Sequence, residues 1–260
     1  MDSGLVRDIK DSHDSRLLEI YGINDSIMQM ICELKTWTRI KICDCEISIP
    51  DEISKLTDLL ILNLHGVKII CISEEITKLT NLTQIHLSGK YIDTIPEVIT
   101  RIPNLARLLV TNVYLLVVPI SIKNLQSVGY MYLENTVHIP DEFAELQQLS
   151  KFRYGTVAKY IPRNVYVHDN KMLVLKFNRS DTVPEGITHL NILDYNGGNL
   201  DCLPVSLEYL KIMELSRPLL NLPMNMKYVA VHWELFDSRF SHEIKLPYGC
   251  ELSIIKHNFL

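Results

Sequence analysis

Apolar positions along the chain follow an order that returns about every 22 residues. Most returns carry an aliphatic residue followed by proline, Ile27-Met28 and Ile72-Ser73 hold the same place without proline, and eight of the eleven prolines occupy this one position. Self-similarity at such a fixed period is the sequence signature of a repeat protein. The aliphatic-proline pairs are Ile49-Pro50, Ile95-Pro96, Val118-Pro119, Ile139-Pro140, Ile161-Pro162, Val183-Pro184, Leu203-Pro204 and Leu222-Pro223.

The spacing within one repeat predicts its local structure. Two apolar residues that are two apart, such as Ile85 and Leu87, suit a strand with both side chains on one face. The three-residue steps before them suit a short helical turn that begins at the proline, where the missing N–H is tolerated. A strand, a turn and a short helical segment of this size cannot bury enough apolar surface alone, so the repeats must stack into one parallel sheet. The clearest repeat has the apolar residues Leu79, Leu82, Ile85, Leu87, Ile92 and Ile95.

This pattern resembles the leucine-rich repeat family, whose signature is LxxLxLxxNxLxxLP, over roughly residues 27–230. The stretch from Leu79 to Pro96 is similar to the intracellular 23-residue class, whereas Val183–Leu190 and Leu203–Leu210 resemble shorter Leu-Pro and FNIP repeats. Mixtures of this kind are similar to repeat proteins of large DNA viruses and amoebae. The resemblance implies an α/β fold: a curved horseshoe solenoid with a parallel sheet on its concave face and short helices or extended segments on its convex face.

One feature departs from the family pattern. The family's turn residue, Asn or Cys, should follow three residues after the second apolar residue of the strand. Only Cys45 matches, while Asn112 and Asn135 stand one residue early, at the position that Gly66 and Gly89 share. Buried backbone groups need partners, so irregular turns or ordered water are expected there. The six positions in question hold Cys45, Val67, Lys90, Val113, Thr136 and Gly198.

The fading of the period toward both ends predicts three regions. Residues 1–16 are polar and are expected to be a disordered N-terminal tail. Residues 17–234 are expected to form one leucine-rich repeat domain of about ten repeats. Residues 235–260 are expected to fold over the last repeat as a C-terminal cap, because a terminal repeat leaves one face unstacked.

The composition and net charge limit the cellular compartment and the kinds of partner that are expected. The net charge is −5, from 26 basic and 31 acidic side chains, which does not favour nucleic acid. The first residues lack the apolar stretch of a signal peptide, and no apolar run approaches a membrane span. Six cysteines in 260 residues are too sparse for a disulfide framework. A monomeric cytoplasmic protein is expected (in the host cytoplasm if it is viral), with no membrane and no nucleic acid partner.

The sequence contains few candidate catalytic or metal-binding motifs. Cys43 and Cys45 are separated by one residue, whereas structural zinc sites use two to four. Phosphate-binding, nucleophile-elbow and histidine-pair motifs are missing from the sequence. The sequence therefore predicts no metal, no cofactor and no enzymatic activity.

The outward face of the predicted sheet is instead a candidate binding surface. The residue between the two core positions of each strand points outward, and this row reads Lys41, Asn63, His86, Leu109, Tyr132, Arg153, Val174, Asp194 and Glu214. Met131, Leu133, Phe152 and Tyr154 are expected to point into the core. Tyr and Arg are enriched in binding hot spots. The predicted binding residues on the concave face are Tyr130, Tyr132, Lys151, Arg153, Arg107 and His86.

These observations favour a non-enzymatic scaffold that binds a protein partner through the concave face, as the family resemblance also implies. A first alternative is a substrate-recruiting adaptor subunit of a larger complex such as a ubiquitin ligase. A second is an enzyme with a loop-borne site that the sequence does not reveal. A third is RNA or lipid binding, which the net charge disfavours although the basic residues around Tyr132 do not.

Overall fold

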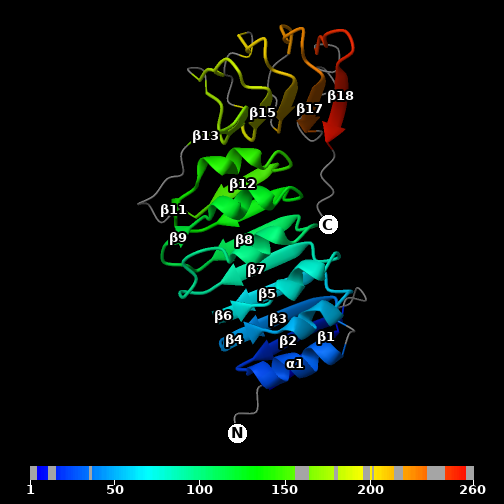
Figure 1. The fold of residues 1–260 in the computed structure, drawn as a ribbon, viewed down its shortest axis with the longest axis vertical. Coiled ribbons are helices and arrows are strands. Elements are labelled where there is room, and N and C mark those ends of the chain that lie inside the picture. The colour runs from blue at the N-terminus through cyan, green and yellow to red at the C-terminus, as the bar shows by residue number, and fades with distance from the viewer. Residues whose placement is uncertain are drawn as a thin grey trace. The chain divides into compact units, whose positions relative to one another are not determined.

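The computed structural model describes residues 5–10, 16–34, 37–155, 164–178, 181–195, 200, 202–213, 219–232 and 244–255. The chain divides into two compact units (Figure 1). Unit 1 comprises Met1–Pro140 with Lys151–Pro162, and unit 2 comprises Asp141–Ser150 with Arg163–Leu260. In the described part of the chain, no helix has the length and apolar character needed to cross a membrane.

Unit 1 contains an eight-stranded sheet in which consecutive repeats lie side by side. The seven strands from β2 onward are parallel, and each pairs with the next without a shift in register. The strand order is β1 (Leu5–Lys10), β2 (Arg16–Tyr21), β3 (Arg39–Cys43), β5 (Ile61–His65), β7 (Gln84–Ser88), β8 (Arg107–Thr111), β10 (Tyr130–Leu133) and β12 (Lys151–Tyr154).

The apolar pairs of the sequence pattern form the core of unit 1. Ile85 and Leu87 are fully buried, as are Leu108 and Val110 on the next strand, and the residues between them are partly exposed. Successive side chains of a strand point to opposite faces, so this alternation puts one face of the sheet against the core. The predicted strands and their α/β solenoid arrangement are confirmed.

Short helical segments follow the proline positions, as predicted. Four 3₁₀-helices belong to unit 1 and a fifth to unit 2, and Pro50, Pro96 and Pro119 stand at the N-caps of three of them. Two short two-stranded sheets link neighbouring repeats beyond the turns. The elements are α1 (Asp25–Glu33), η1 (Asp51–Lys55), η2 (Glu74–Lys78), η3 (Glu97–Arg101), η4 (Ile120–Asn124), η5 (Asp141–Glu145), β4 (Glu46–Ile49) with β6 (Lys68–Ile72), and β9 (Leu116–Val117) with β11 (Thr136–His138).

The turns after the strands are more regular than expected from the missing Asn ladder. One residue at the strand end adopts the left-handed conformation, with φ between 51° and 66°. Glycine and Asn or Asp tolerate this conformation best. Backbone bonds then join neighbouring turns, as from the Asp44 N–H to the His65 carbonyl at 2.9 Å. The residues concerned are Gly22, Asp44, Gly66, Asn112 and Asn135.

Strands lie within both of the predicted end regions. Within the expected disordered tail 1–16, residues 5–10 form β1, which pairs antiparallel with β2. This pairing satisfies backbone groups that the first repeat would otherwise leave open at the sheet edge. Within the expected cap 235–260, β18 (Glu251–Ile255) continues the sheet of unit 2 in parallel with β17 (Tyr228–His232). Residues 233–243 and 256–260 lie outside the described residues.

Unit 2 has its own sheet and its own core, whereas one repeat domain over 17–234 was expected. The hairpin of β13 (Val165–His168) and β14 (Lys171–Val174) opens a six-stranded sheet that continues through β15 (His189–Ile192), β16 (Tyr209–Ile212), β17 and β18. Its core includes Met172, Val174, Leu190, Ile192, Phe177, Leu210, Ile212, Val229 and Val231.

The outward row predicted for these later strands is therefore displaced. Val174 is fully buried, and Asp194 lies beyond the end of β15. Glu214 lies outside the described residues. The central positions between core residues are Leu173, Asn191, Lys211 and Ala230, which are in register with one another.

Candidate functional site

Five of the six predicted binding residues lie together on β8, β10 and β12 of unit 1. Tyr130 is in register with Arg107 on one side and Lys151 on the other, and Tyr132 is in register with Arg153. Adjacent strands stand about 4.8 Å apart, so these side chains form one surface, called here the Arg-Tyr face. It is defined by Arg107, Tyr130, Tyr132, Lys151 and Arg153.

The alternation of inward and outward side chains along β10 positions the two tyrosines. Met131 and Leu133 are fully buried, while Tyr130 and Tyr132 are half-buried on the opposite side of β10. The Arg107 guanidinium carbon lies 5.1 Å from the centre of the Tyr130 ring, a cation–π arrangement that holds both side chains in place. The Nε atom of Arg107 is buried without a hydrogen-bond partner among the described residues.

The strand β12 is less buried than predicted, although its residues keep the facing of β10. Phe152 is only half-buried, and Tyr154 is 40% exposed, although both were expected to point into the core. Their rings lie 6.0 Å apart. Arg153 is exposed, as predicted, and Lys151 is half-buried.

Positive charge dominates the Arg-Tyr face. The outward positions within β8, β10 and β12 hold two arginines, one lysine, two tyrosines, Leu109 and Thr111, but no carboxylate. Glu134 follows directly after β10 and accepts a hydrogen bond from the Asn112 backbone N–H at 2.7 Å. The face can therefore attract an anionic partner while its rings offer apolar contact area.

His86 stands apart from these charges. It lies on β7, in register with Leu109, and its Nε2 is 2.8 Å from the Thr111 hydroxyl. Burial, with the nearby His65 and Lys41, lowers the pKa of His86. A neutral His86 is a hydrogen-bonding member of the sheet surface rather than a fourth cation of the Arg-Tyr face.

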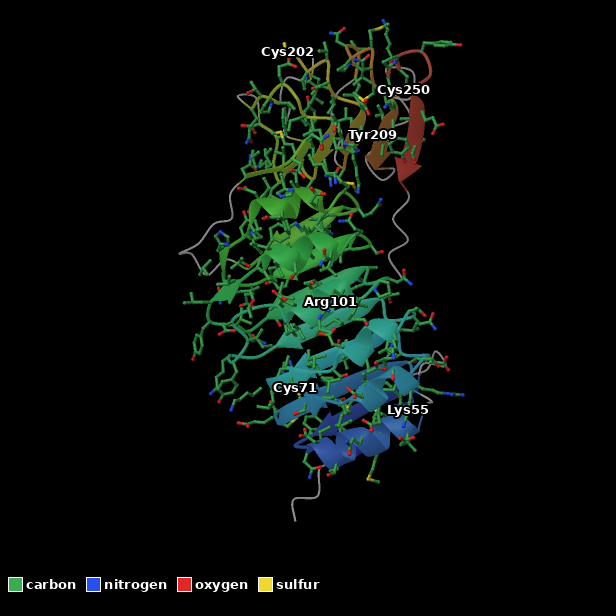
Figure 2. All side chains as sticks on the ribbon, viewed as in Figure 1. Lys55, Cys71, Arg101, Cys202, Tyr209 and Cys250 are labelled. Atoms are coloured by element: carbon green, nitrogen blue, oxygen red, sulfur yellow. The ribbon has the colours of Figure 1, made fainter. Side chains whose placement is uncertain are left out.

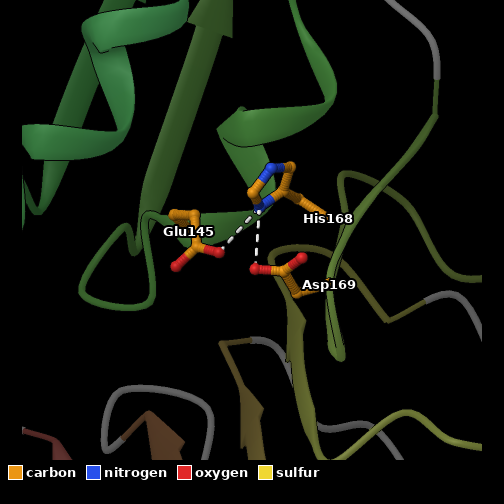
Figure 3. Close-up of side chains that lie close together, drawn as sticks. All are labelled: Glu145, His168 and Asp169. Atoms are coloured by element: carbon orange, nitrogen blue, oxygen red, sulfur yellow. Dashed lines mark hydrogen bonds and ion pairs between the residues drawn. The ribbon is translucent and has the colours of Figure 1, made fainter.

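A second polar cluster lies in unit 2, and the sequence motifs did not reveal it (Figure 3). His168 Nδ1 lies 2.9 Å from Glu145 Oε1 and 3.6 Å from Asp169 Oδ2. Lys171 forms an ion pair with the other oxygen of Glu145. Burial raises the pKa of Glu145, but the hydrogen bonds from Lys171 and His168 outweigh burial, and the pKa lies below its usual value.

The donor types in this cluster are those of a metal site. One ligand atom from each of Glu145, His168 and Asp169 lies within 4.8 Å of the others. The Lys171 ammonium competes for Glu145, however, and neutralises part of the negative charge that a cation would need. The cluster also joins η5 to the β13–β14 hairpin, which gives it a structural role within unit 2. A two-residue Asp169-Asn170 turn between alternating strands was the sequence signal for this hairpin.

The similarity of this chain to known proteins is low. No family model matches the sequence, and no curated protein matches it. The leucine-rich repeat domain of the type III effector XopL is 15% identical with a TM-score of 0.46, covering 92% of this chain and 75% of that one. The internalin InlF from Listeria monocytogenes is 16% identical with a TM-score of 0.39, covering 92% and 82%.

The complex PEPR1–AtPEP1 is 15% identical with a TM-score of 0.44, and the match covers 96% of this chain but 36% of that one. All three identities are below 25%, and all three TM-scores are below 0.5. Within the chain itself, repeats of 22 to 23 residues each place one parallel strand beside the next in register. The repeat sequence and this strand ladder together give the chain a fold that resembles that of leucine-rich repeat proteins.

Proposed function

We propose that the protein is a non-enzymatic scaffold that binds an extended acidic segment of a partner protein on the Arg-Tyr face. The observation that carries this proposal is the gathering of Arg107, Lys151 and Arg153 around two half-buried tyrosines. Carboxylates are the natural complement of arginine, which binds them through two parallel hydrogen bonds.

An extended segment suits the geometry of the face. The outward side chains repeat about every 4.8 Å from strand to strand, so a chain that crosses the strands meets a new pair of side chains at each step. Arg107 is held against Tyr130, which reduces the conformational entropy that binding must remove. Tyr and Arg of this kind are the residue types in which binding energy concentrates.

The first test uses two blocked peptides of equal length, a hexaglutamate and a hexaglutamine, titrated against the intact protein by fluorescence anisotropy. Hexaglutamate should bind at least about tenfold more tightly, and its affinity should fall as salt screens the charges. Equal affinities for the two peptides would remove the basis for an acidic partner.

The second test compares variants. Tyr132→Ala and Arg153→Glu should each weaken hexaglutamate binding by about 1–3 kcal/mol if the residues are hot spots. Lys90→Glu is the matched control, because it makes the same charge change as Arg153→Glu at an exposed turn residue away from the strands. Equal loss in Lys90→Glu would show that only net charge matters and would contradict a defined face.

An adaptor subunit would use the same face for its substrate and a different surface for the rest of its complex. Affinity purification from nuclease-treated lysate with wild type and Tyr132→Ala separates the two roles. Proteins lost with Tyr132→Ala belong to the Arg-Tyr face. Ubiquitin-ligase subunits retained by both proteins would identify an adaptor, and RNA retained before nuclease treatment and lost in Arg153→Glu would point to nucleic acid instead.

A further inference from the structure

A pocket of about 340 Å³ lies on the sheet of unit 2. One wall is the segment that follows η5, with Gln147, Gln148 and Ser150, and the other is formed by β15, β16 and β17. Tyr209, labelled in Figure 2, belongs to this second wall. The volume is at the lower end of the range for small-molecule sites, and such sites combine apolar walls with a few convergent polar groups.

The polar group that sets this pocket apart is the Lys211 ammonium. Its Nζ donates hydrogen bonds to the backbone carbonyls of Gln147, Gln148 and Leu149, at 3.1, 3.0 and 3.3 Å. Carbonyl dipoles orient the ammonium but bring no negative charge. Burial lowers the pKa of Lys211 to about 8, and burial is the only cause of this shift. Among the described residues, no carboxylate forms an ion pair with Lys211.

Two acidic side chains of unit 2 already form ion pairs with lysines other than Lys211. Glu208 pairs with Lys227 at 2.7 Å, and Glu145 pairs with Lys171. A buried cation without a counter-ion is costly, and the described lining of the pocket holds no carboxylate that would offset Lys211. An anionic group that entered the pocket would supply that negative charge.

Aromatic side chains in the second wall of the pocket determine which ligand body fits beside the anionic group. His189, Tyr209 and Tyr228 stand in register on three adjacent strands. The His189 and Tyr209 rings stack at 4.3 Å with planes 13° apart, so each covers a face of the other and their edges remain for contact. Aromatic edges carry partial positive charge, which adds to the field of Lys211. Burial and the Lys171 charge lower the pKa of His189, so this ring is neutral near pH 7 and adds no second cation to the pocket.

We propose that this pocket binds a small monocarboxylate whose apolar or aromatic body packs against Tyr209 and Tyr228 while its carboxylate lies beside Lys211. A dianion such as a phosphate ester fits less well, because the described lining holds one uncompensated cation. The site belongs to unit 2 and is independent of the Arg-Tyr face.

A matched pair of probes tests the charge requirement without any variant. Phenylacetate and phenylacetamide have nearly the same shape, and only phenylacetate is charged. Titration of the intact protein at about pH 7.5, followed by NMR or calorimetry, should show phenylacetate binding at least about tenfold more tightly. Equal binding of the two, or no binding of either, would overturn the proposal.

The pH dependence identifies the cation. Lys211, His189, Tyr209 and Tyr228 are the titratable groups that line the pocket, and His189 is neutral at both pH values compared here. Between about pH 7.5 and about pH 9.5 the charged fraction of a lysine with a pKa of about 8 falls about twentyfold, and phenylacetate affinity should fall by a similar factor. An affinity that does not change would exclude Lys211 as the partner.

Two variants separate Lys211 from the phenols. Lys211→Arg keeps a charge that does not titrate in this range, so phenylacetate binding should become independent of pH. The double variant Tyr209→Phe with Tyr228→Phe removes both hydroxyls and should keep the wild-type pH profile. If the profile instead disappears in the phenylalanine variant, the phenols control binding and the assignment to Lys211 is wrong.

A final arm identifies the source of the carboxylate. N-acetylphenylalanine carries it at a chain end, whereas phenylacetate is a free acid. Tighter binding of N-acetylphenylalanine than of its amide would indicate that the pocket accepts the C-terminal residue of a peptide. Exclusion of N-acetylphenylalanine with retention of phenylacetate would restrict the site to free small acids.

Discussion

A glycine substitution in the turns of unit 1 offers a sharp test of the repeat geometry. Gly66 has φ of +66° and lies against Asp44 of the preceding repeat, so that a Cβ added at Gly66 would come within 2.2 Å of Asp44 Oδ1. Gly22 occupies the equivalent turn with φ of +59°, and a Cβ there would meet nothing within 4 Å. Substitution by alanine therefore introduces the same backbone strain at both positions, but only at Gly66 does it also introduce a clash with Asp44.

The magnitudes follow from these two contributions. A side chain in the left-handed conformation costs about 1–2 kcal/mol, which is the expected loss of unfolding free energy in Gly22→Ala. In Gly66→Ala the Asp44 carboxylate must also move out of its rotamer, which adds about 1 kcal/mol. Gly66→Ala should therefore lose about 2–3 kcal/mol.

The assay is urea unfolding followed by circular dichroism, with the wild type and both single variants at one protein concentration. A third protein, Gly66→Ala with Asp44→Gly, removes the clashing carboxylate and should lose no more than Gly22→Ala. Equal losses in Gly22→Ala and Gly66→Ala, with no recovery in the double variant, would show that Asp44 does not contact this turn. A loss close to zero in Gly22→Ala would refute the left-handed turn itself.

Three further predictions concern unit 2 and the thiols. Phe143→Ala should destabilise the protein by about 3–5 kcal/mol in urea unfolding, because Phe143 is fully buried, whereas half-buried Phe152→Ala should cost less. Glu145 has a folded-state pKa below its usual value, so it stabilises the fold above the usual carboxyl pKa and loses this contribution as the pH falls through the folded pKa; the stability gap between wild type and Glu145→Gln should therefore narrow toward about pH 3. Cys71 is exposed (Figure 2), whereas burial raises the pKa of Cys32 to about 12, so a thiol reagent should label Cys71 in the native protein and Cys32 only after unfolding.

The repeat pattern predicted most of unit 1 because its determinants are local. The steps among Leu79, Leu82, Ile85 and Leu87 fix which side chains face the core, and a slip of one residue would expose all of them. In the same register, Tyr132 is half-buried and Arg153 is exposed. The exposure of Tyr154 was not predictable in this way, because it depends on what packs beyond the last strand of a sheet rather than on the repeat.

The later strands were misplaced for a physical reason that the sequence does contain. The β13–β14 hairpin around Asp169 and Asn170 interrupts the parallel sheet, and a count of 21 residues onward from Arg153, the step between Tyr132 and Arg153, falls on Val174 instead of Leu173. The Lys211 pocket was missed for another reason. Its second wall is the Gln147–Ser150 segment, which is more than 60 residues distant in sequence, and no repeat period relates the two.

The antiparallel strands β1 and β13 each occupy the first position of a sheet. A sheet that begins in this way has a fixed starting point, from which parallel strands follow at constant spacing. Gene duplication or deletion of a whole repeat beyond that point would preserve every strand pairing and change the distance between two outward side chains by about 4.8 Å. In evolution, the length of such a surface can thus increase or decrease by one strand spacing at a time, while the fold stays the same.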